Sequence, residues 1–124
     1  MARLSRRVGP FLVVAVASLA LSACGTGGAV TDARAACKEV HAALRLQAQS
    51  EVPTITNARQ SQLQSNALSE LLRATPAAAA ATSADGSWNP LMTTINEAER
   101  VPLQNLVASL TRLCRVADSS TPYL

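Results

Sequence analysis

Side chains able to catalyse a reaction are few in this chain of 124 residues. His41 is its single histidine, and so the one imidazole available as a general base or metal ligand. No serine stands in a G-x-S-x-G sequence or in another nucleophile motif. Glu97 and Glu99 are two residues apart, which places them on different faces of a helix. We therefore predict no enzyme activity, no metal site and no cofactor, with His41 on a helix surface or satisfied in a core.

The N-terminal segment has the pattern of an export signal. Three arginines occur among the first seven residues, and residues 8–23 form an apolar run without charge. This run is shorter than the roughly 20 apolar residues that a membrane-spanning helix needs, and it ends in small residues. We predict a signal peptide over residues 1–23.

The signal ends in Leu21, Ser22, Ala23 and Cys24. These four residues resemble the lipobox of bacterial lipoproteins, position by position. The resemblance implies cleavage before Cys24, a diacylglyceryl group on its sulfur, and often an acyl group on the new amine. Two or three acyl chains hold a protein stably on a bilayer, because each buried methylene contributes about 0.8 kcal/mol. We therefore expect a lipid-anchored protein on the extracytoplasmic face of the cell membrane. The alternative is cleavage after Gly25, which would release a soluble protein.

The cysteine count agrees with this compartment. The chain has three cysteines, and Cys24 belongs to the processing site. Cys37 and Cys114 remain as a pair that can form a disulfide outside the reducing cytosol. This bond would tie the first helix to the last and would contribute roughly 4 to 5 kcal/mol in the chain-entropy model.

The charges give no case for a nucleic-acid partner. The formal net charge is +3, and the three arginines of the signal account for it. The remaining eight basic and eight acidic residues are scattered, which is typical of solvated helix faces. Only Trp88 and Tyr123 are aromatic after the signal, too few to stack sugars, single-stranded nucleic acid or flat cofactors.

Apolar spacings of three and four residues predict an all-α fold, and no segment alternates with the period of a strand. We expect a lipidated cysteine and flexible Gly-rich tether over 24–31, a helical domain over 32–118 and a tail over 119–124. The domain is expected to be a small disulfide-tied bundle of four main helices with a short Ala-rich helix.

The expected boundaries follow from caps and prolines. Thr31 or Asp32 would cap the first helix, with Cys37, Val40, Leu44 and Ala48 on its buried side, and Pro53 would follow its end. The second helix would open at Thr54, and the Ala-rich helix would have Thr75 as N-cap and Pro76 as its first residue. Ser87 or Asn89 would cap the next helix, and residues 99–101 would form a corner before Pro102 and the last helix.

Two surfaces are candidates for binding. Trp88 is either a core residue or, with Asp85 in an exposed loop, a contact for a partner protein. A groove between helices lined by Leu63, Leu71, Ile95 and Leu106 would suit an acyl chain or a partner helix, although a filled core explains the same residues.

Arginine is preferred over lysine and alanine is frequent, and in this the chain is similar to small helical cell-envelope lipoproteins of mycobacteria and related actinobacteria. That similarity implies no activity. We hypothesise a non-catalytic binding or scaffolding module that contacts an envelope protein. The alternative is a carrier of a lipid or small apolar ligand.

Overall fold

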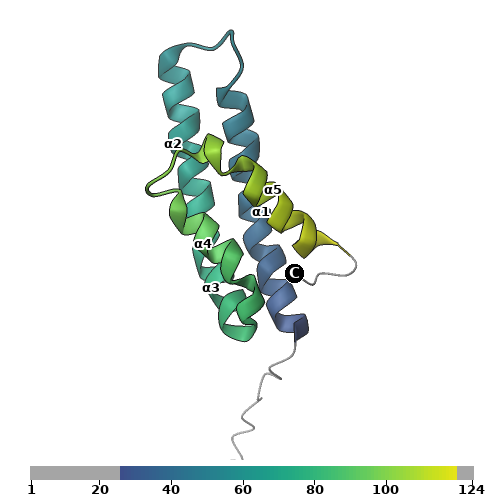
Figure 1. Cartoon of the computed structure of the whole chain (residues 1–124). Coiled ribbons are helices and arrows are strands. Elements are labelled where there is room, and N and C mark those ends of the chain that lie inside the picture. The colour runs from purple at the N-terminus through teal and green to yellow at the C-terminus, as the bar shows by residue number, and fades with distance from the viewer. Residues whose placement is uncertain (1–25, 120–124) are drawn as a thin grey trace, which may run out of the picture.

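A computed structural model describes residues 26–119, and in this range the chain is helical, without a strand. The longest helix, α1, runs the length of the described structure; α2, α3 and α5 pack along it, and α4 packs against α3 and α5 (Figure 1). The elements are α1 (Thr26–Ser50), α2 (Asn57–Arg73), α3 (Thr75–Ala84), η1 (Gly86–Trp88), α4 (Asn89–Glu97), η2 (Leu103–Asn105) and α5 (Val107–Asp118). The prediction of an all-α bundle of four main helices with a short Ala-rich helix is confirmed, and α3 is the Ala-rich helix.

The buried face of α1 consists of small residues in a heptad-like repeat. Its members alternate at spacings of four and three, which keeps them on one side of the helix. Side chains this small allow a neighbouring helix to lie close against α1. They are Ala29, Ala33, Ala36, Val40, Ala43, Gln47 and Ser50.

Two successive helices cover this face. α2 contributes Leu63, Ala67 and Leu71, and α3 continues with Ala78 and Ala81, all of them buried. Ala74 alone separates the two helices, so they together accompany α1 along most of its length (Figure 1).

The prolines end and begin helices much as predicted. α1 ends at Ser50, shortly before Pro53. Pro76 and Pro90 lie in the first turns of α3 and α4, where a missing N–H leaves no hydrogen bond unmade. Pro102 separates α4 from η2 and α5, so the predicted break into two helices is confirmed.

Three predicted N-termini are wrong. α1 begins at Thr26, so residues 26–31 of the expected tether are helical, because Ala29 and Ala33 are buried against the bundle. α2 begins after Thr56, whose hydroxyl accepts a hydrogen bond from the Arg59 N–H, and not at Thr54. Thr75 is itself helical, and Ala74 occupies the N-cap position of α3.

The start of α4 also differs from the prediction. Trp88, and neither Ser87 nor Asn89, occupies its N-cap position, and no side chain caps this helix. The short helix η1 leads directly into α4, so its last residue takes the place of a cap.

The buried stripe predicted for α1 is correct only in part. Cys37 and Val40 are fully buried, whereas Leu44 is half-buried and Ala48 is exposed. The predicted positions Val40, Leu44 and Ala48 follow each other at intervals of four residues. Because a helical turn has 3.6 residues, such positions move gradually around the helix and leave the buried face.

No helix within residues 26–119 combines the length and hydropathy needed to cross a bilayer. The predicted signal peptide over 1–23 and Cys24 lie outside the described residues, as does most of the predicted tail.

Candidate functional site

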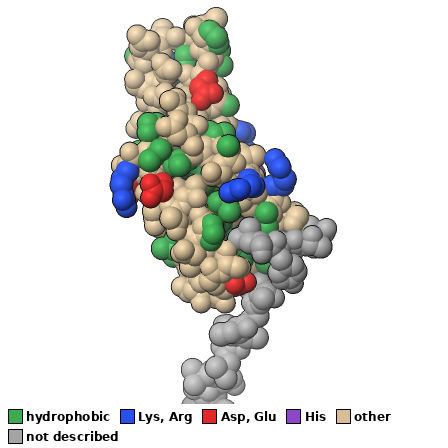
Figure 2. Space-filling view, viewed as in Figure 1, with side chains coloured by type: hydrophobic (Ala, Val, Ile, Leu, Met, Phe, Trp, Pro, Cys, Tyr) green, Lys and Arg blue, Asp and Glu red, His purple; other side chains and the backbone are tan. Residues whose placement is uncertain are grey.

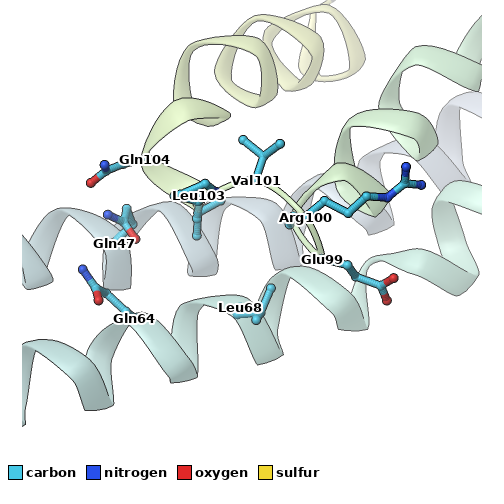
Figure 3. Close-up of a pocket in the computed structure, with 10 residues that line it drawn as sticks. Gln47, Gln64, Leu68, Glu99, Arg100, Val101, Leu103 and Gln104 are labelled. Atoms are coloured by element: carbon cyan, nitrogen blue, oxygen red, sulfur yellow. The ribbon is translucent and has the colours of Figure 1, made fainter.

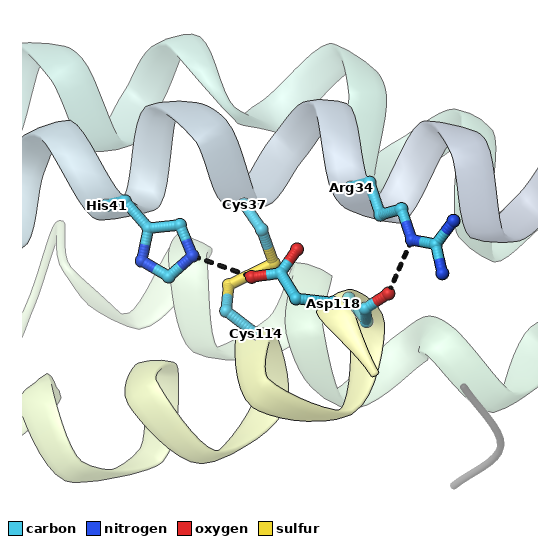
Figure 4. Close-up of a disulfide and its surroundings, with 6 residues drawn as sticks. Arg34, Cys37, His41, Cys114 and Asp118 are labelled. Atoms are coloured by element: carbon cyan, nitrogen blue, oxygen red, sulfur yellow. Dashed lines mark hydrogen bonds and ion pairs between the residues drawn. A yellow bond between two sulfur atoms is a disulfide. The ribbon is translucent and has the colours of Figure 1, made fainter. Parts of the chain in front are cut away.

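The predicted disulfide is present and joins α1 to α5 (Figure 4). Cys37 and Cys114 are bonded, their Cα atoms are 5.5 Å apart, and both side chains are fully buried. The bond spans a sequence separation of 77 residues. It therefore fixes the last helix of the bundle to the first.

Polar contacts lie on both sides of the disulfide. The Arg34 guanidinium donates from Nε to the carbonyl oxygen of Ala117 at 2.8 Å and from NH2 to that of Ser119 at 3.0 Å. His41 Nε2 lies 2.8 Å from Asp118 Oδ2 (Figure 4). Arg34, Cys37 and His41 are roughly one helical turn apart, so one face of α1 holds the end of α5 at three points. The arginine also satisfies carbonyl groups that the end of a helix leaves unpaired.

His41 therefore lies in a surface pair. Its side chain and that of Asp118 are each 45% exposed. Within residues 26–119, no group of three or more His, Cys, Asp or Glu side chains is arranged to hold a metal ion.

Trp88 belongs to the core. It is 1% exposed, so the alternative that Trp88 contacts a partner is wrong for this conformation. The indole ring is the largest fully buried side chain, and η1, which carries it, packs against the Ala-rich α3.

Asp85 has a local structural role beside it. Its carboxylate Oδ1 accepts a hydrogen bond from the Ser87 N–H at 3.0 Å and so caps η1. This bond stabilises the charged carboxylate and holds the pKa of Asp85 below the ordinary value. The stabilisation is present above the unfolded-state pKa and is lost as pH falls through the folded-state pKa. The predicted contact of Asp85 with a partner stays a prediction.

The groove predicted between the helices is not where we expected it. Leu63, Leu71 and Ile95 are buried in the core, and Leu106 packs half-buried against it. None of these four residues lines the groove that the structure contains. They fill the space between the helices, as close packing of a small bundle favours.

A groove of about 480 Å³ lies instead between α1, α2 and the connection from α4 to α5 (Figure 3). Three glutamines stand at one end, Leu68, Val101 and Leu103 lie in the middle, and Glu99 and Arg100 are at the other end. Gln47 comes from α1, Gln64 from α2 and Gln104 from η2. The lining thus changes along the groove from amide to apolar to charged.

Gln47 is the buried polar member of this lining. It is only 3% exposed, and its Nε2 donates to Glu51 Oε1 at 3.0 Å. No partner for its Oε1 is found among the described residues, and no fully buried side-chain oxygen there lacks a partner. Gln47 thus brings a largely buried side-chain amide to the lining of the groove.

The face seen in Figure 2 has no extended patch of one charge. On the face shown in Figure 2, basic and acidic side chains are interspersed among polar and apolar ones. Residues 46–69 form one end of the bundle, and their only charged side chains are Glu51 and Arg59. Most of the other exposed positions in this range are Gln, Ser, Thr or Asn. This end of the bundle is therefore polar but carries few charges.

The glutamine groove was missed from the sequence. A signal for it exists, because Gln47 follows Ala29, Ala33, Ala36, Val40 and Ala43 in the four-three repeat of the buried face. A glutamine in that register is a polar residue at a core position, and such positions call for a structural or functional reason.

Comparisons with models of protein families, with curated proteins and with solved structures found no match to this chain.

Proposed function

We propose that this chain is a lipoprotein anchored through acyl chains on Cys24, and that its helical domain is a non-catalytic module that binds an envelope protein. The observation that carries the proposal is the sequence Leu21-Ser22-Ala23-Cys24, directly after an apolar run and a basic N-terminus. Only Gly25 separates Cys24 from the first residue of α1. The domain would therefore stand close to the membrane surface.

The disulfide supports an extracytoplasmic location. Disulfides persist in oxidising compartments and are rare where thiols are kept reduced. Cys37 and Cys114 are fully buried and bonded, which also leaves Cys24 as the one cysteine outside the pair.

The placement of His41 supports binding over catalysis. Its imidazole is engaged with Asp118 on an exposed surface, away from the groove residues. A general base requires a substrate held within hydrogen-bond reach, which normally takes a concave site.

The second hypothesis, a carrier of an apolar ligand, has less support. Three of the four leucine and isoleucine side chains proposed to line its groove are core residues. The groove that exists places three glutamines beside its apolar floor, and an apolar ligand would leave their amide groups without partners.

The anchor is tested by the mass of the protein extracted from membranes of cells that express all 124 residues. We expect a chain that begins at Cys24 and carries two or three acyl groups, and we expect Cys24→Ser to release the protein from the membrane fraction. An unacylated chain beginning at Thr26 would refute the anchor.

Binding is tested by in-cell cross-linking from photoreactive residues placed one at a time at exposed positions such as Val52 and Gln104. We expect the same envelope protein to be captured from each of these positions. Copurified lipid together with no captured protein would favour the carrier instead.

A further inference from the structure

The amide groups at the groove are arranged to meet another polar chain. Gln47 and Gln64 extend toward one another from α1 and α2, and Gln104 stands above them on η2 (Figure 3). Each side-chain amide carries both hydrogen-bond donors and an acceptor. A main-chain peptide group also has a donor and an acceptor, so the two can pair. The nearly buried Gln47 lines this end of the groove, and its Nε2 already donates to Glu51.

The rest of the lining limits what can bind. Leu68 and Leu103 form an apolar floor next to the glutamines, and Val101 lies beside them on the connection with its side chain pointing away from Leu68. Glu99 and Arg100 are exposed at the far end, and their opposite charges leave the groove without net charge. A segment with several charges of one sign would therefore gain no net electrostatic attraction to the groove, so the lining favours an uncharged segment.

The groove is also far from the predicted anchor. Gln47 lies 21 residues after Thr26 in a continuous helix, which corresponds to roughly 30 Å along α1. With α1 upright on the membrane, the groove would open well outside the headgroups, within reach of a protein in the envelope space.

We propose that the groove between α1, α2 and η2 binds an extended, uncharged peptide segment of a partner protein, with one aliphatic side chain on the floor and main-chain amides paired with Gln47, Gln64 and Gln104. This inference rests on the proposed function and adds to it the binding site and the class of partner. The volume of about 480 Å³ lies within the range of roughly 300 to 1,000 Å³ that is typical of ligand sites.

An acyl chain is a poorer occupant of the same space. It would cover the amides of Gln47, Gln64 and Gln104 without offering a hydrogen bond. Polar groups that lose water without gaining a partner oppose binding.

The test is a selection of displayed random heptapeptides on the full chain, expressed with all 124 residues and purified in nonionic detergent from whichever cell fraction contains it. We expect enriched peptides to be uncharged, with one central Leu, Ile, Val or Met. The double substitution Gln64→Ala, Gln104→Ala changes two exposed helical positions and should weaken the selected peptides about tenfold, as two lost hydrogen bonds would. Gln49→Ala, on an exposed position of α1 outside the groove, is the matched control and should leave their affinity unchanged.

Several results would overturn the inference. These are failure to enrich any peptide, enrichment of charged peptides, or equal affinity of the selected peptides for the double variant and the control. A fluorescent palmitic acid probe that binds the wild type and is lost in the double variant, without peptide enrichment, would assign the groove to an acyl chain.

The two proposals fail in different ways. If cross-linking from Val52 captures a defined envelope protein and the double variant captures it equally well, the binding module stands and the groove does not. If Cys24 is unacylated but the peptides still bind in the groove, the peptide site stands and the lipid anchor does not.

Discussion

Two sides of α1 differ in how completely they are closed. On one side, α5 is attached by the Cys37–Cys114 bond, and Arg34 and His41 bind the last residues of that helix. On the other, ten residues further along α1, Gln47 lines a groove that no element of the described chain fills. The first side is closed by a covalent bond and polar contacts within the chain, whereas the second is open to a partner.

This difference separates stability from binding along one helix. Cys37 lies roughly 15 Å closer to the start of α1 than Gln47 does, so the covalent tie is on the half of the helix nearer the predicted anchor. The groove half relies on packing alone. Substitutions at the disulfide should therefore change stability, and substitutions at the groove should change binding.

The largest effect is expected from removing the disulfide. Cys37→Ser with Cys114→Ser should lower the free energy of unfolding by roughly 4 to 5 kcal/mol, because the unfolded chain regains the entropy of a long loop. For a domain of this size, that is a fall of about 15 °C or more in Tm. Thermal unfolding followed by circular dichroism measures it, with Cys24 left intact in both proteins. An unchanged Tm would show that packing alone closes this side.

A smaller loss is expected from enlarging the buried face of α1. Ala36→Leu should cost about 1 to 3 kcal/mol, because Ala36 is fully buried where α2 and α3 pack against the helix. The matched control is Ala35→Leu at the neighbouring exposed position, where we expect a change within about 0.5 kcal/mol. Urea unfolding measures both values, and equal costs would contradict close packing along the alanine repeat.

Gln47→Met tests why a glutamine is kept in that repeat. Methionine has a similar length and no polar amide, and Glu51 is exposed and can turn to water once its partner is lost. We expect stability to change by less than about 1 kcal/mol, since replacing a buried polar group with an apolar one of similar shape is nearly neutral. Binding of the selected peptides should fall clearly. A large loss of stability with unchanged peptide binding would make Gln47 a structural residue only.

The smallest effect is expected at His41. Both members of its pair with Asp118 are 45% exposed, so His41→Ala should cost at most about 1 kcal/mol. A double-mutant cycle with Asp118→Ala isolates the interaction, and its value should shrink further in high salt. A coupling energy of several kcal/mol would mean that this pair, and not the disulfide alone, holds α5 in place.

Much of the fold follows from local patterns. Proline positions and the spacing of apolar residues predict the helices, the Ala-rich α3 and the break before α5 correctly. The starts of helices were less predictable. The start of α1 at Thr26 depends on burial against the other helices, which the local sequence does not show. The start of α2 at Asn57 depends on which of the neighbouring threonines acts as the N-cap, and their residue type does not decide this.

The candidate groove was beyond local patterns for a different reason. Apolar residues such as Leu63, Leu71 and Ile95 can line a groove or fill a core equally well. Only the packing of the helices shows that they belong to the core. Gln47, Gln64 and Gln104 belong to three elements and are brought together by the connection between α4 and α5.

The sequence by itself determined the helical class, the pairing of Cys37 with Cys114, and the lipobox on which the proposed anchor rests. These depend on short-range spacing and on the number of cysteines, which can be counted along a chain. The tertiary structure decided that Trp88 fills the core, that Arg34 and His41 bind the end of α5, and that a groove opens at Gln47. Each of these depends on which helix faces lie against each other, and that is set only when all the helices pack together.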